Sequence, residues 1–434
     1  MIDRGQNGRY LSIFKNLKSG NNLRLIGPKT WDALVVGGGA AGILAAISSA
    51  ETGQQTLLLE GNQQLGRKVL IAGNGRCNLT NRDADDPEHY HGTQPHFVRQ
   101  VLRAFPLQET LTFFRDLGLE VKEEKRGRLF PTSDQAQAVV DLLEDRLGQL
   151  GVGVVKGAKI CRAVRAETGF VVDSRDGRSW TGRRLVLASG GVSVPKLGAD
   201  GSGLELAKGF GHRATQLLPG LVPLLSPDEY IRPAQGVKVW AEVRVALGKG
   251  RQAIDTDDLL FTPYGVSGFT ILNLSARIVP FLERGPLDLA INLFPGQSPE
   301  QVSEILKKRW ERHPQRGLAF SFTGLLHGKL VGPLLVKLGA APDQPVGRVP
   351  KAQRWELARL LTSWAVQVTQ PRDFDHAEVT IGGIHTSEVD PVTLESYLVP
   401  GLYLAGELLD VHGDLGGFNL QWAWASGAVA GRGG

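Results

Sequence analysis

Apolar positions near the start of the chain change from strand-like to helix-like spacing and back. Asp32–Val36 ends in an almost continuous apolar run, which is typical of a strand buried on both faces of a parallel sheet. Apolar residues then recur at helical spacing over Ala40–Ala50, and a second apolar run covers Gln55–Leu59. This order predicts two parallel strands joined by a crossover helix.

Further helices and strands are predicted beyond this unit. Val98–Leu117 has helical spacing with a break at Pro106. Thr132 and Gln135 have the spacing of a capping box for a helix that ends near Leu150. Short runs with strand character follow at Val152–Lys156, Gly169–Asp173 and Leu185–Ala188.

The pattern becomes less regular after residue 191. Short strands and prolines are scattered up to about residue 372, with a helix near Glu300–His313. We therefore predict an α/β fold class. One discontinuous domain with a mixed or parallel sheet comprises residues 31–191 and 373–434, and an α+β insert domain, residues 192–372, interrupts it.

The composition fits a globular protein of two or three domains. The chain has 434 residues, of which 42% are apolar, and its net charge of +5 gives no sign of nucleic-acid binding. Two cysteines, Cys77 and Cys161, make no disulfide framework and predict a reducing, cytoplasmic location. Since no run of about 18 apolar residues occurs, no membrane span is predicted.

Residues 1–30 differ from the rest of the chain. They are rich in Arg, Lys, Asn and Gly, and Asp3 is the single acid among them. Because they lack the apolar core of a secretory signal, we predict a disordered tail, with a targeting segment as the alternative.

Three glycines follow the first predicted strand. Gly37 allows a tight turn, Gly39 removes a side chain where the backbone approaches a pyrophosphate, and Gly42 lets the helix pack closely on the strand. The helix begins at Ala40 and Ala41, where free N–H groups would face the phosphates. The pattern predicts a dinucleotide site.

An acid ends the second predicted strand. Glu60 follows Gly37 by 23 positions, close to the separation of about 20 that is expected for a ribose-binding acid. A carboxylate there accepts both ribose hydroxyls and repels a 2′-phosphate.

A glycine cluster near the carboxyl terminus distinguishes FAD from NAD. An apolar strand ends at Gly406 and Glu407, and Gly416 and Gly417 then open a helical segment. Glu407 is predicted to accept hydrogen bonds from ribityl hydroxyls. The helix would direct its positive end at the N1/O2 edge of the flavin.

Two more glycine pairs follow predicted strands. Thr380, Gly382 and Gly383 are expected to lie flat against the isoalloxazine ring, and Gly190 and Gly191 to lie beside the adenosine half. Each pair alone is typical of a turn. Four such clusters at strand ends together favour an FAD site.

Six segments carry a resemblance to a known family. They are GRKVLIAGNGRCNLTN, GRLFPTSDQA, ASGGVSVPKLGADGSG, LLFTPYGVSG, AEVTIGGI and GELLDVHGDLGGFNLQWAWASG. With them the chain resembles, from Trp31 onward, the YhiN/BaiN-like bacterial flavoproteins, often labelled "aminoacetone oxidase family FAD-binding enzyme". More distantly it resembles the fumarate reductase-type flavoproteins.

The resemblance implies a Rossmann-type FAD-binding domain at residues 31–191 and 373–434, with the insert carrying substrate contacts. It also implies that a loop at Gly66–Asn81 faces FAD, with Arg67 and Lys68 near the pyrophosphate. For Cys77 we favour a packing role over a redox role, because no second cysteine lies close to it in the sequence. Further residues expected at the cofactor are Gly75, Arg76, Cys77, Asn78 and Asn419.

Candidate catalytic residues lie before the last helix. His412 is a candidate proton donor for hydride transfer to a double bond, with a structural role as the alternative. Asp414 and Tyr264 are further candidates. Glu88–His96 contains a His-x-His spacing, but without other clustered ligands we interpret it as a polar loop and predict no metal.

These features predict an FAD-dependent oxidoreductase that transfers hydride through flavin N5. NAD(P)H is the expected donor, although no second dinucleotide fingerprint occurs. The expected acceptor is a small organic molecule, by C=C reduction or by amine or alcohol oxidation. The alternative is a flavoprotein that acts on RNA or with a protein partner. It requires a basic face on the insert, which shows no dense Lys/Arg run, so nucleic acid is not expected. The oligomeric state is left open.

Overall fold

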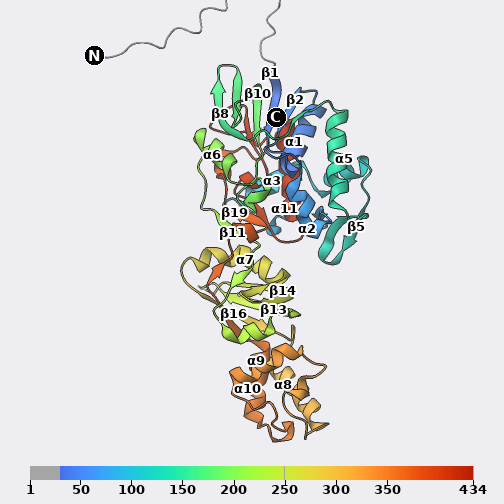
Figure 1. Cartoon of the computed structure of the whole chain (residues 1–434), viewed down its shortest axis with the longest axis vertical. Coiled ribbons are helices and arrows are strands. Elements are labelled where there is room, and N and C mark those ends of the chain that lie inside the picture. The colour runs from blue at the N-terminus through green and yellow to red at the C-terminus, as the bar shows by residue number, and fades with distance from the viewer. Residues whose placement is uncertain (1–29, 249, 434) are drawn as a thin grey trace, which may run out of the picture.

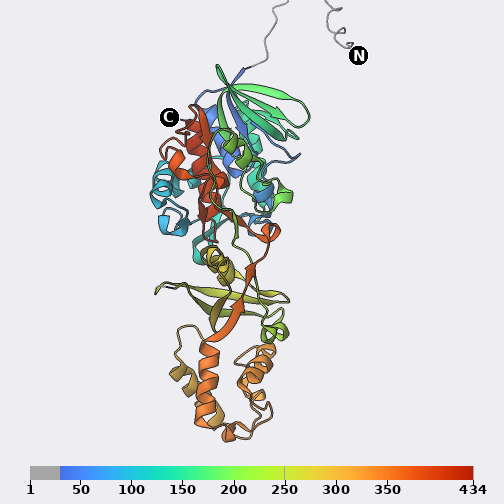
Figure 2. The same ribbon diagram turned by 90° about the vertical axis from the view of Figure 1, so that its left-hand side faces the viewer.

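The computed structural model describes residues 30–248 and 250–433. These residues form an elongated molecule with three tiers: an α/β upper tier, a middle tier with an antiparallel sheet, and a lower tier of helices (Figures 1 and 2). The tail predicted at residues 1–30 lies outside the described residues, apart from Thr30, which begins the first strand.

Five parallel strands form the centre of the upper tier, in the order β7-β2-β1-β10-β20. Residues Ala33–Val36 of β1 are all buried, as expected for a strand covered on both faces. The five strands are β1 (Thr30–Val36), β2 (Thr56–Leu59), β7 (Gly153–Val155), β10 (Ser179–Leu187) and β20 (Leu402–Leu404).

The same sheet has an antiparallel extension. β9 (Gly169–Ser174) pairs with the first half of β10, and β8 (Ile160–Ala166) pairs with β9. The predicted α/β class with a mixed sheet is therefore confirmed.

Two helices of the upper tier, α1 (Ala40–Glu51) and α11 (Phe418–Arg432), touch through their backbones. A Cβ at Gly427 would lie 2.2 Å from the Ala41 oxygen, and one at Gly431 would lie 2.3 Å from the Ala45 oxygen. Since the contacts advance by four residues in the same direction along both helices, α1 and α11 run parallel. Since α11 begins nine residues before Gly427, its amino end extends about 12 Å beyond that of α1, at 1.5 Å per residue.

Other helices of the upper tier test the predictions. α3 (Pro95–Ala104) and α4 (Leu107–Asp116) confirm the break at Pro106. The capping box at Thr132 and Gln135 is wrong: α5 (Ala136–Gln149) has Gln135 itself as its N-cap, without a side-chain capping bond.

The segment Gly66–Asn81 differs from the predicted loop. It begins as helix α2 (Arg67–Gly75), and the backbone leaves helical geometry from Ala72 to Asn74. The helix is interrupted locally, because Gly73 and Asn74 both have left-handed φ angles, of 59° and 58°.

The middle tier has its own hydrophobic core, which also includes the helices of the lower tier. Its sheet has the order β17-β16-β13-β14-β15-β12-β18, with antiparallel pairing throughout. The strands are β12 (Leu224–Leu225), β13 (Lys238–Ala246), β14 (Gln252–Thr262), β15 (Gly265–Ser267), β16 (Leu287–Asn292), β17 (Trp364–Val368) and β18 (Gln370–Pro371).

Four helices accompany this sheet. The helix predicted near Glu300–His313 is confirmed as α8, which begins with a capping box between Ser298 and Gln301. The other three were not predicted. In two of them Pro280 and Pro333 lie inside the helix and resemble breaks. The four are α7 (Phe269–Leu282), α8 (Pro299–Glu311), α9 (Gly328–Leu338) and α10 (Lys351–Thr362).

The chain crosses between the upper and middle tiers on two short strands. β11 (Leu218–Gly220) and β19 (Val379–Ile381) pair with each other antiparallel. α6 (Ser202–Gly209) packs in the upper core, and the middle core extends from Val222 to Ala377. The exact domain boundaries stay a prediction. Within the described part of the chain, no helix combines the length and apolarity needed to cross a membrane.

Candidate cofactor site

The carboxyl ends of the parallel strands bring Glu60 together with three of the predicted glycine clusters. Gly37 follows β1, Glu60 follows β2, Gly190 follows β10 and Gly406 follows β20. In an open parallel sheet, ligands bind beyond this edge, where the strand order changes direction. Four segments that are remote in sequence therefore share one edge.

The glycines after β1 have two different surroundings. A Cβ at Gly37 would lie 2.5 Å from the Ala188 oxygen, and one at Gly42 would lie 1.7 Å from the Gly37 oxygen. A Cβ at Gly39 would meet no atom within 4 Å, and no side chain caps the helix there. Gly37 and Gly42 are thus required by packing. Gly39 leaves the amino end of α1 open to an anion.

Glu60 is held by three donors. Its Oε2 accepts from the Gly38 N–H at 2.6 Å, and its Oε1 accepts from the Asn62 N–H and Nδ2 at 2.6 and 2.7 Å. Arg67 donates to Asn62 Oδ1 at 2.8 Å and to the Lys196 oxygen at 2.9 Å. Arg67 therefore supports the Glu60 turn, and its predicted role at the pyrophosphate is not tested.

Glu407 joins four segments. Its carboxylate accepts from Lys68 Nζ at 2.6 Å, from Ser193 Oγ at 2.7 Å and from the Thr380 N–H at 2.7 Å. Burial alone would raise the pKa of Glu407, but the Lys68 ammonium and these hydrogen bonds lower it, so the carboxylate is charged. A Cβ at Gly191 would lie 2.3 Å from Thr380 Oγ1, so this position has room only for a glycine.

The remaining glycine pairs are packed against protein backbone. A Cβ at Gly382 would lie 2.2 Å from the Gln216 oxygen, and one at Gly383 would lie 2.6 Å from the Leu409 oxygen. Gly190 has a left-handed φ of 77°. Packing alone accounts for Gly382 and Gly383, and their predicted contact with the flavin ring stays a prediction.

His412 is buried without a hydrogen-bond partner. Its strand β21 (His412–Gly413) pairs with β4 (Tyr90–His91), and the rings of His412 and His91 lie 5.4 Å apart. The side chain is 4% exposed, and neither ring nitrogen has a partner among the described residues. Burial lowers the pKa of His412 to about 3, so the imidazole is neutral at physiological pH.

Asp414 binds two histidines from a remote loop. Its carboxylate lies 3.0 Å from His89 Nδ1 and 2.7 Å from His91 Nε2. Burial opposes the charge of Asp414, but the hydrogen bonds from both histidines outweigh it and lower its pKa to about 2. The hydrogen bond with Asp414 raises the pKa of His89. No group of three or more His, Cys, Asp or Glu in the described ranges is arranged to hold a metal.

The loop before α11 is fixed by Asn419. Its Oδ1 accepts from the Gly413 N–H at 2.7 Å, and its Nδ2 donates to the Gly413 oxygen at 2.9 Å. Gly417, with φ of 108°, is the N-cap of α11 and supplies no side-chain cap. A Cβ at Gly417 would lie 2.4 Å from the Thr80 oxygen. The amino end of α11 is therefore a second uncapped helix terminus at this edge.

Arg76 and Cys77, in the segment after α2, have separate environments. Arg76 pairs with Glu124 at 2.7 Å and stacks on the Phe130 ring at 4.2 Å, so its guanidinium is directed at β5 (Val121–Glu124) and β6 (Arg128–Pro131). Burial raises the pKa of Cys77 to about 12, which makes the thiol a poor nucleophile. Within the described part of the chain, the ion pairs and ring contact of Arg76 involve Glu124, Asp134 and Phe130, and none of these is a predicted site residue.

Tyr264 lies apart from His412 and Asp414. It is in the turn between β14 and β15 of the middle tier, where the Arg372 guanidinium covers its ring at 4.6 Å. In the described ranges, none of its recorded contacts reaches the sheet edge.

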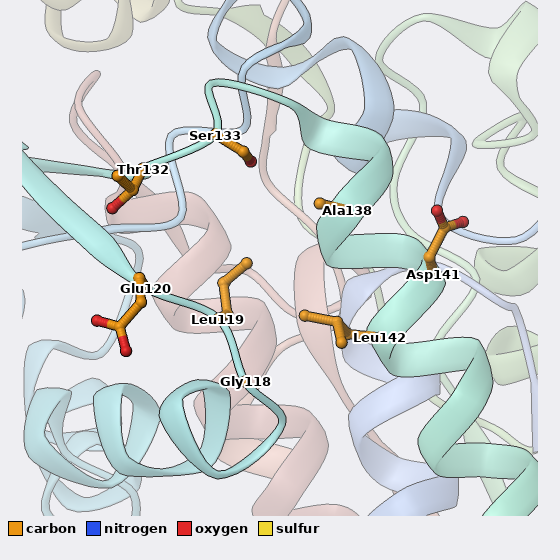
Figure 3. Close-up of a pocket in the computed structure, with 8 residues that line it drawn as sticks. All are labelled: Gly118, Leu119, Glu120, Thr132, Ser133, Ala138, Asp141 and Leu142. Carbon is orange, nitrogen blue, oxygen red and sulfur yellow. The ribbon is translucent and has the colours of Figure 1, made fainter.

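A surface pocket of about 500 Å³ lies elsewhere on the upper tier (Figure 3). None of its residues belongs to the predicted site. They come from the turn after α4, the end of β6 and one face of α5: Gly118, Leu119, Glu120, Thr132, Ser133, Ala138, Asp141 and Leu142.

Orphaned polar atoms test whether the sheet edge fits FAD. Among the residues that the structure describes, Asn78 Oδ1 and Ser189 Oγ are buried without hydrogen-bond partners, as are both ring nitrogens of His412. Buried polar atoms are nearly always paired, so these atoms fit a bound group that supplies donors and acceptors. With two open helix ends and an acid after β2, the residues present fit FAD.

This fold and site define a Rossmann-type flavoprotein. The chain belongs to the family described as HI0933-like protein Rossmann domain, whose model matches residues 31–433. This confirms the predicted family and the class of FAD-dependent oxidoreductase.

Two curated relatives cover almost the whole chain. The 3-dehydro-bile acid delta(4,6)-reductase of Clostridium scindens is 38% identical over 92% of this chain and 97% of its own length. The ribosomal RNA dihydrouridine synthase of Escherichia coli is 33% identical over 91% of this chain and 96% of its own length. Among solved structures, a flavocytochrome c3 fumarate reductase is 16% identical, with a TM-score of 0.47, over 94% of this chain and 78% of that chain.

Sequence reasoning missed the contribution of His89 and His91. The His-x-His spacing was visible, but Asp414, which joins the two rings, follows His91 by 323 positions. The pairing of β4 with β21 brings them together, and nothing local in the sequence indicates that pairing.

Proposed function

We propose that the chain reduces a carbon–carbon double bond conjugated to a carbonyl, with FAD bound along the carboxyl edge of the upper sheet. The names of the two relatives support this, because each describes saturation of a ring double bond, in one case beside a 3-keto group and in the other in uracil. NAD(P)H is the proposed electron donor.

The residues that would hold FAD follow the two parallel helices. The amino end of α1 at Gly39 would face the pyrophosphate, Glu60 would bind a ribose, and the amino end of α11 would face the flavin. The offset of about 12 Å between the two helix ends suits an elongated ligand that meets both. When bound, FAD supplies the hydride acceptor and donor, flavin N5.

The observation that carries the proposal is the unpartnered, neutral His412 in the loop before α11. A neutral imidazole does not serve as a strong acid, which changes the role predicted for it. Its N–H can instead donate a hydrogen bond to the substrate carbonyl, which polarises the conjugated double bond. Hydride would then add to the carbon β to the carbonyl, and a proton from water would complete the reduction at the α carbon. His91, which packs beside His412, and Asp414 would position that ring.

The test separates the two half-reactions. In anaerobic stopped-flow measurements, His412→Phe should slow reoxidation of the reduced flavin by 2-cyclohexenone on the order of 100-fold, because one preorganised donor is lost. Reduction of the flavin by NADH or NADPH should stay unchanged. His412→Asn, which keeps an N–H donor, should recover part of the rate. Equal reoxidation by His412→Phe and the unsubstituted protein would contradict the proposal.

A further inference from the structure

The lower tier concentrates positive charge. Residues 299–362 contain eleven Lys and Arg and five Asp and Glu, a net charge of +6, whereas the whole chain carries +5. The cations are scattered singly or in short groups along the sequence, so no dense run marks them. The tier forms the end of the molecule farthest from the parallel sheet (Figures 1 and 2).

Helix packing collects these cations at one end of the tier. α8 and α10 are antiparallel: Leu293, just before α8, donates to the oxygen of Leu361, near the end of α10, at 2.9 Å. Arg354, in the first turn of α10, donates to Ser303 Oγ at 3.4 Å. The start of α10 therefore lies beside the middle of α8.

The connecting loops close the same end. The Gly347 N–H donates to the Pro314 oxygen at 2.8 Å, and the Val346 N–H donates to the Arg316 oxygen at 2.9 Å. The loop after α8 thus lies against the loop before α10. We call the exposed cations of these segments the basic tip: Lys308, Arg312, Arg316, Arg348 and Lys351.

The basic tip lacks counter-charges. Within residues 30–248 and 250–433, none of its five side chains forms an ion pair, whereas nearby Lys307 and Arg359 pair with Glu304 and Glu356 at 3.8 and 3.5 Å. Like charges without partners oppose folding, and they favour binding of a polyanion, whose counterions are released.

An aromatic ring accompanies these charges. Phe320 is 60% exposed, and the Arg316 guanidinium lies 5.6 Å from its ring centre. An exposed ring beside cations is the arrangement on which nucleic-acid bases stack while the backbone is neutralised.

We propose that the basic tip binds the phosphate backbone of an RNA that presents a uracil base at the sheet edge. This inference rests on the proposed function and chooses RNA as its substrate class. An RNA is long enough to contact both ends of the molecule, and uracil carries a double bond conjugated to a carbonyl. The relative named as a ribosomal RNA dihydrouridine synthase supports the choice.

The test compares two full-length quadruple variants. One is Arg312→Gln/Arg316→Gln/Arg348→Gln/Lys351→Gln. Its matched control removes four exposed arginines of the upper tier, Arg103→Gln/Arg115→Gln/Arg175→Gln/Arg183→Gln. The affinity of each protein for a fluorescein-labelled, uridine-rich RNA stem-loop is measured by anisotropy between about 50 and 200 mM salt. Binding to phosphatidylglycerol vesicles and reduction of 2-cyclohexenone are measured in parallel.

The basic-tip variant should bind the RNA on the order of 100-fold more weakly, with a salt slope smaller by about 3, while the control binds as the unsubstituted protein does. The unsubstituted protein and both variants should reduce 2-cyclohexenone equally. Equal RNA binding by both variants, or vesicle binding that needs the tip while RNA binding does not, would overturn the inference. RNA binding that needs the tip, with no reduction of 2-cyclohexenone or of RNA uridine by the unsubstituted protein, would instead overturn the proposed function.

Discussion

The carboxyl edge of the upper sheet and the basic tip of the lower tier are assembled in opposite ways. At the edge, each position is constrained by atoms a few ångströms away: Gly42 has no room for a Cβ, and Glu60 is held by three donors. At the tip, the five cationic side chains form no ion pairs within the described residues, and their summed charge is what matters. The comparison teaches that tight backbone contacts leave a sequence pattern, whereas a charged surface built from separate helices does not.

The largest expected effect separates packing from ligand contact at the edge. Gly42→Val should unfold the upper tier or prevent its expression, because its side chain would overlap the Gly37 carbonyl. Gly39→Val should leave the apoprotein folded, because the position is open, yet abolish FAD binding. Circular dichroism melting and the ratio of flavin to protein absorbance measure the two effects. A yellow, stable Gly39→Val protein would show that the pyrophosphate lies elsewhere.

A smaller effect is expected at the end of β2. Glu60→Gln keeps an acceptor for the Gly38 N–H but loses the charge, so the Kd for FAD should rise about 10- to 100-fold, or about 1.4 to 2.7 kcal/mol. Isothermal titration of the apoprotein measures it, with Glu167→Gln, on an exposed turn, as the control. An unchanged Kd would remove Glu60 from the ribose contact.

Asp414 gives the edge a pH dependence. The pKa of Asp414, about 2, lies below its unfolded value of about 3.9, so its stabilisation is present above about pH 4 and is lost as pH falls toward 2. The pKa of His89 is raised, so its contribution is present below about pH 6.5 and declines as pH rises further. Asp414→Asn should therefore lower the free energy of unfolding most near pH 5, by on the order of 2 kcal/mol.

Denaturant unfolding of the apoprotein between about pH 3 and 8 measures this difference. Asp116→Asn, on the exposed end of α4, is the control. A loss of stability that is the same at every pH would mean that the pairing of Asp414 with the histidines is not electrostatic.

The smallest effect concerns the contact between the upper and middle tiers. Arg126 pairs with Asp257 at 2.9 Å and donates to the Thr256 oxygen at 2.7 Å. Because Arg126 is 39% exposed, Arg126→Gln should lower the free energy of unfolding by less than about 1 kcal/mol and leave FAD binding unchanged. Arg82→Gln, which breaks an ion pair with Glu123 inside the upper tier, is the control for melting temperature. A loss of FAD with Arg126→Gln would mean that the tiers cooperate in binding it.

The sequence predicted much of the edge, because its requirements are local. The order of strand, glycine turn and helix around Gly37 to Gly42 is a backbone pattern, and so is the glycine pair before α11. Packing also explains Gly382 and Gly383, although their contact with a flavin ring is untested.

Features that depend on tertiary pairing were not predictable. The joining of His91 to Asp414 requires β4 to pair with β21, and the capping box at Thr132 failed because α5 begins later than its spacing suggests. The basic tip was missed for the same reason. Its cations come from two segments, residues 308–316 and 348–351, which are remote in sequence and which the antiparallel packing of α8 and α10 brings together.

Hydrogen–deuterium exchange of the apoprotein with and without FAD tests the central claim that remote segments bind one cofactor. We expect FAD to protect amides at the amino end of α1, from Gly39, and at the amino end of α11, from Phe418, at the same FAD concentration. Protection confined to one of these segments, or confined to the pocket between β6 and α5, would contradict it.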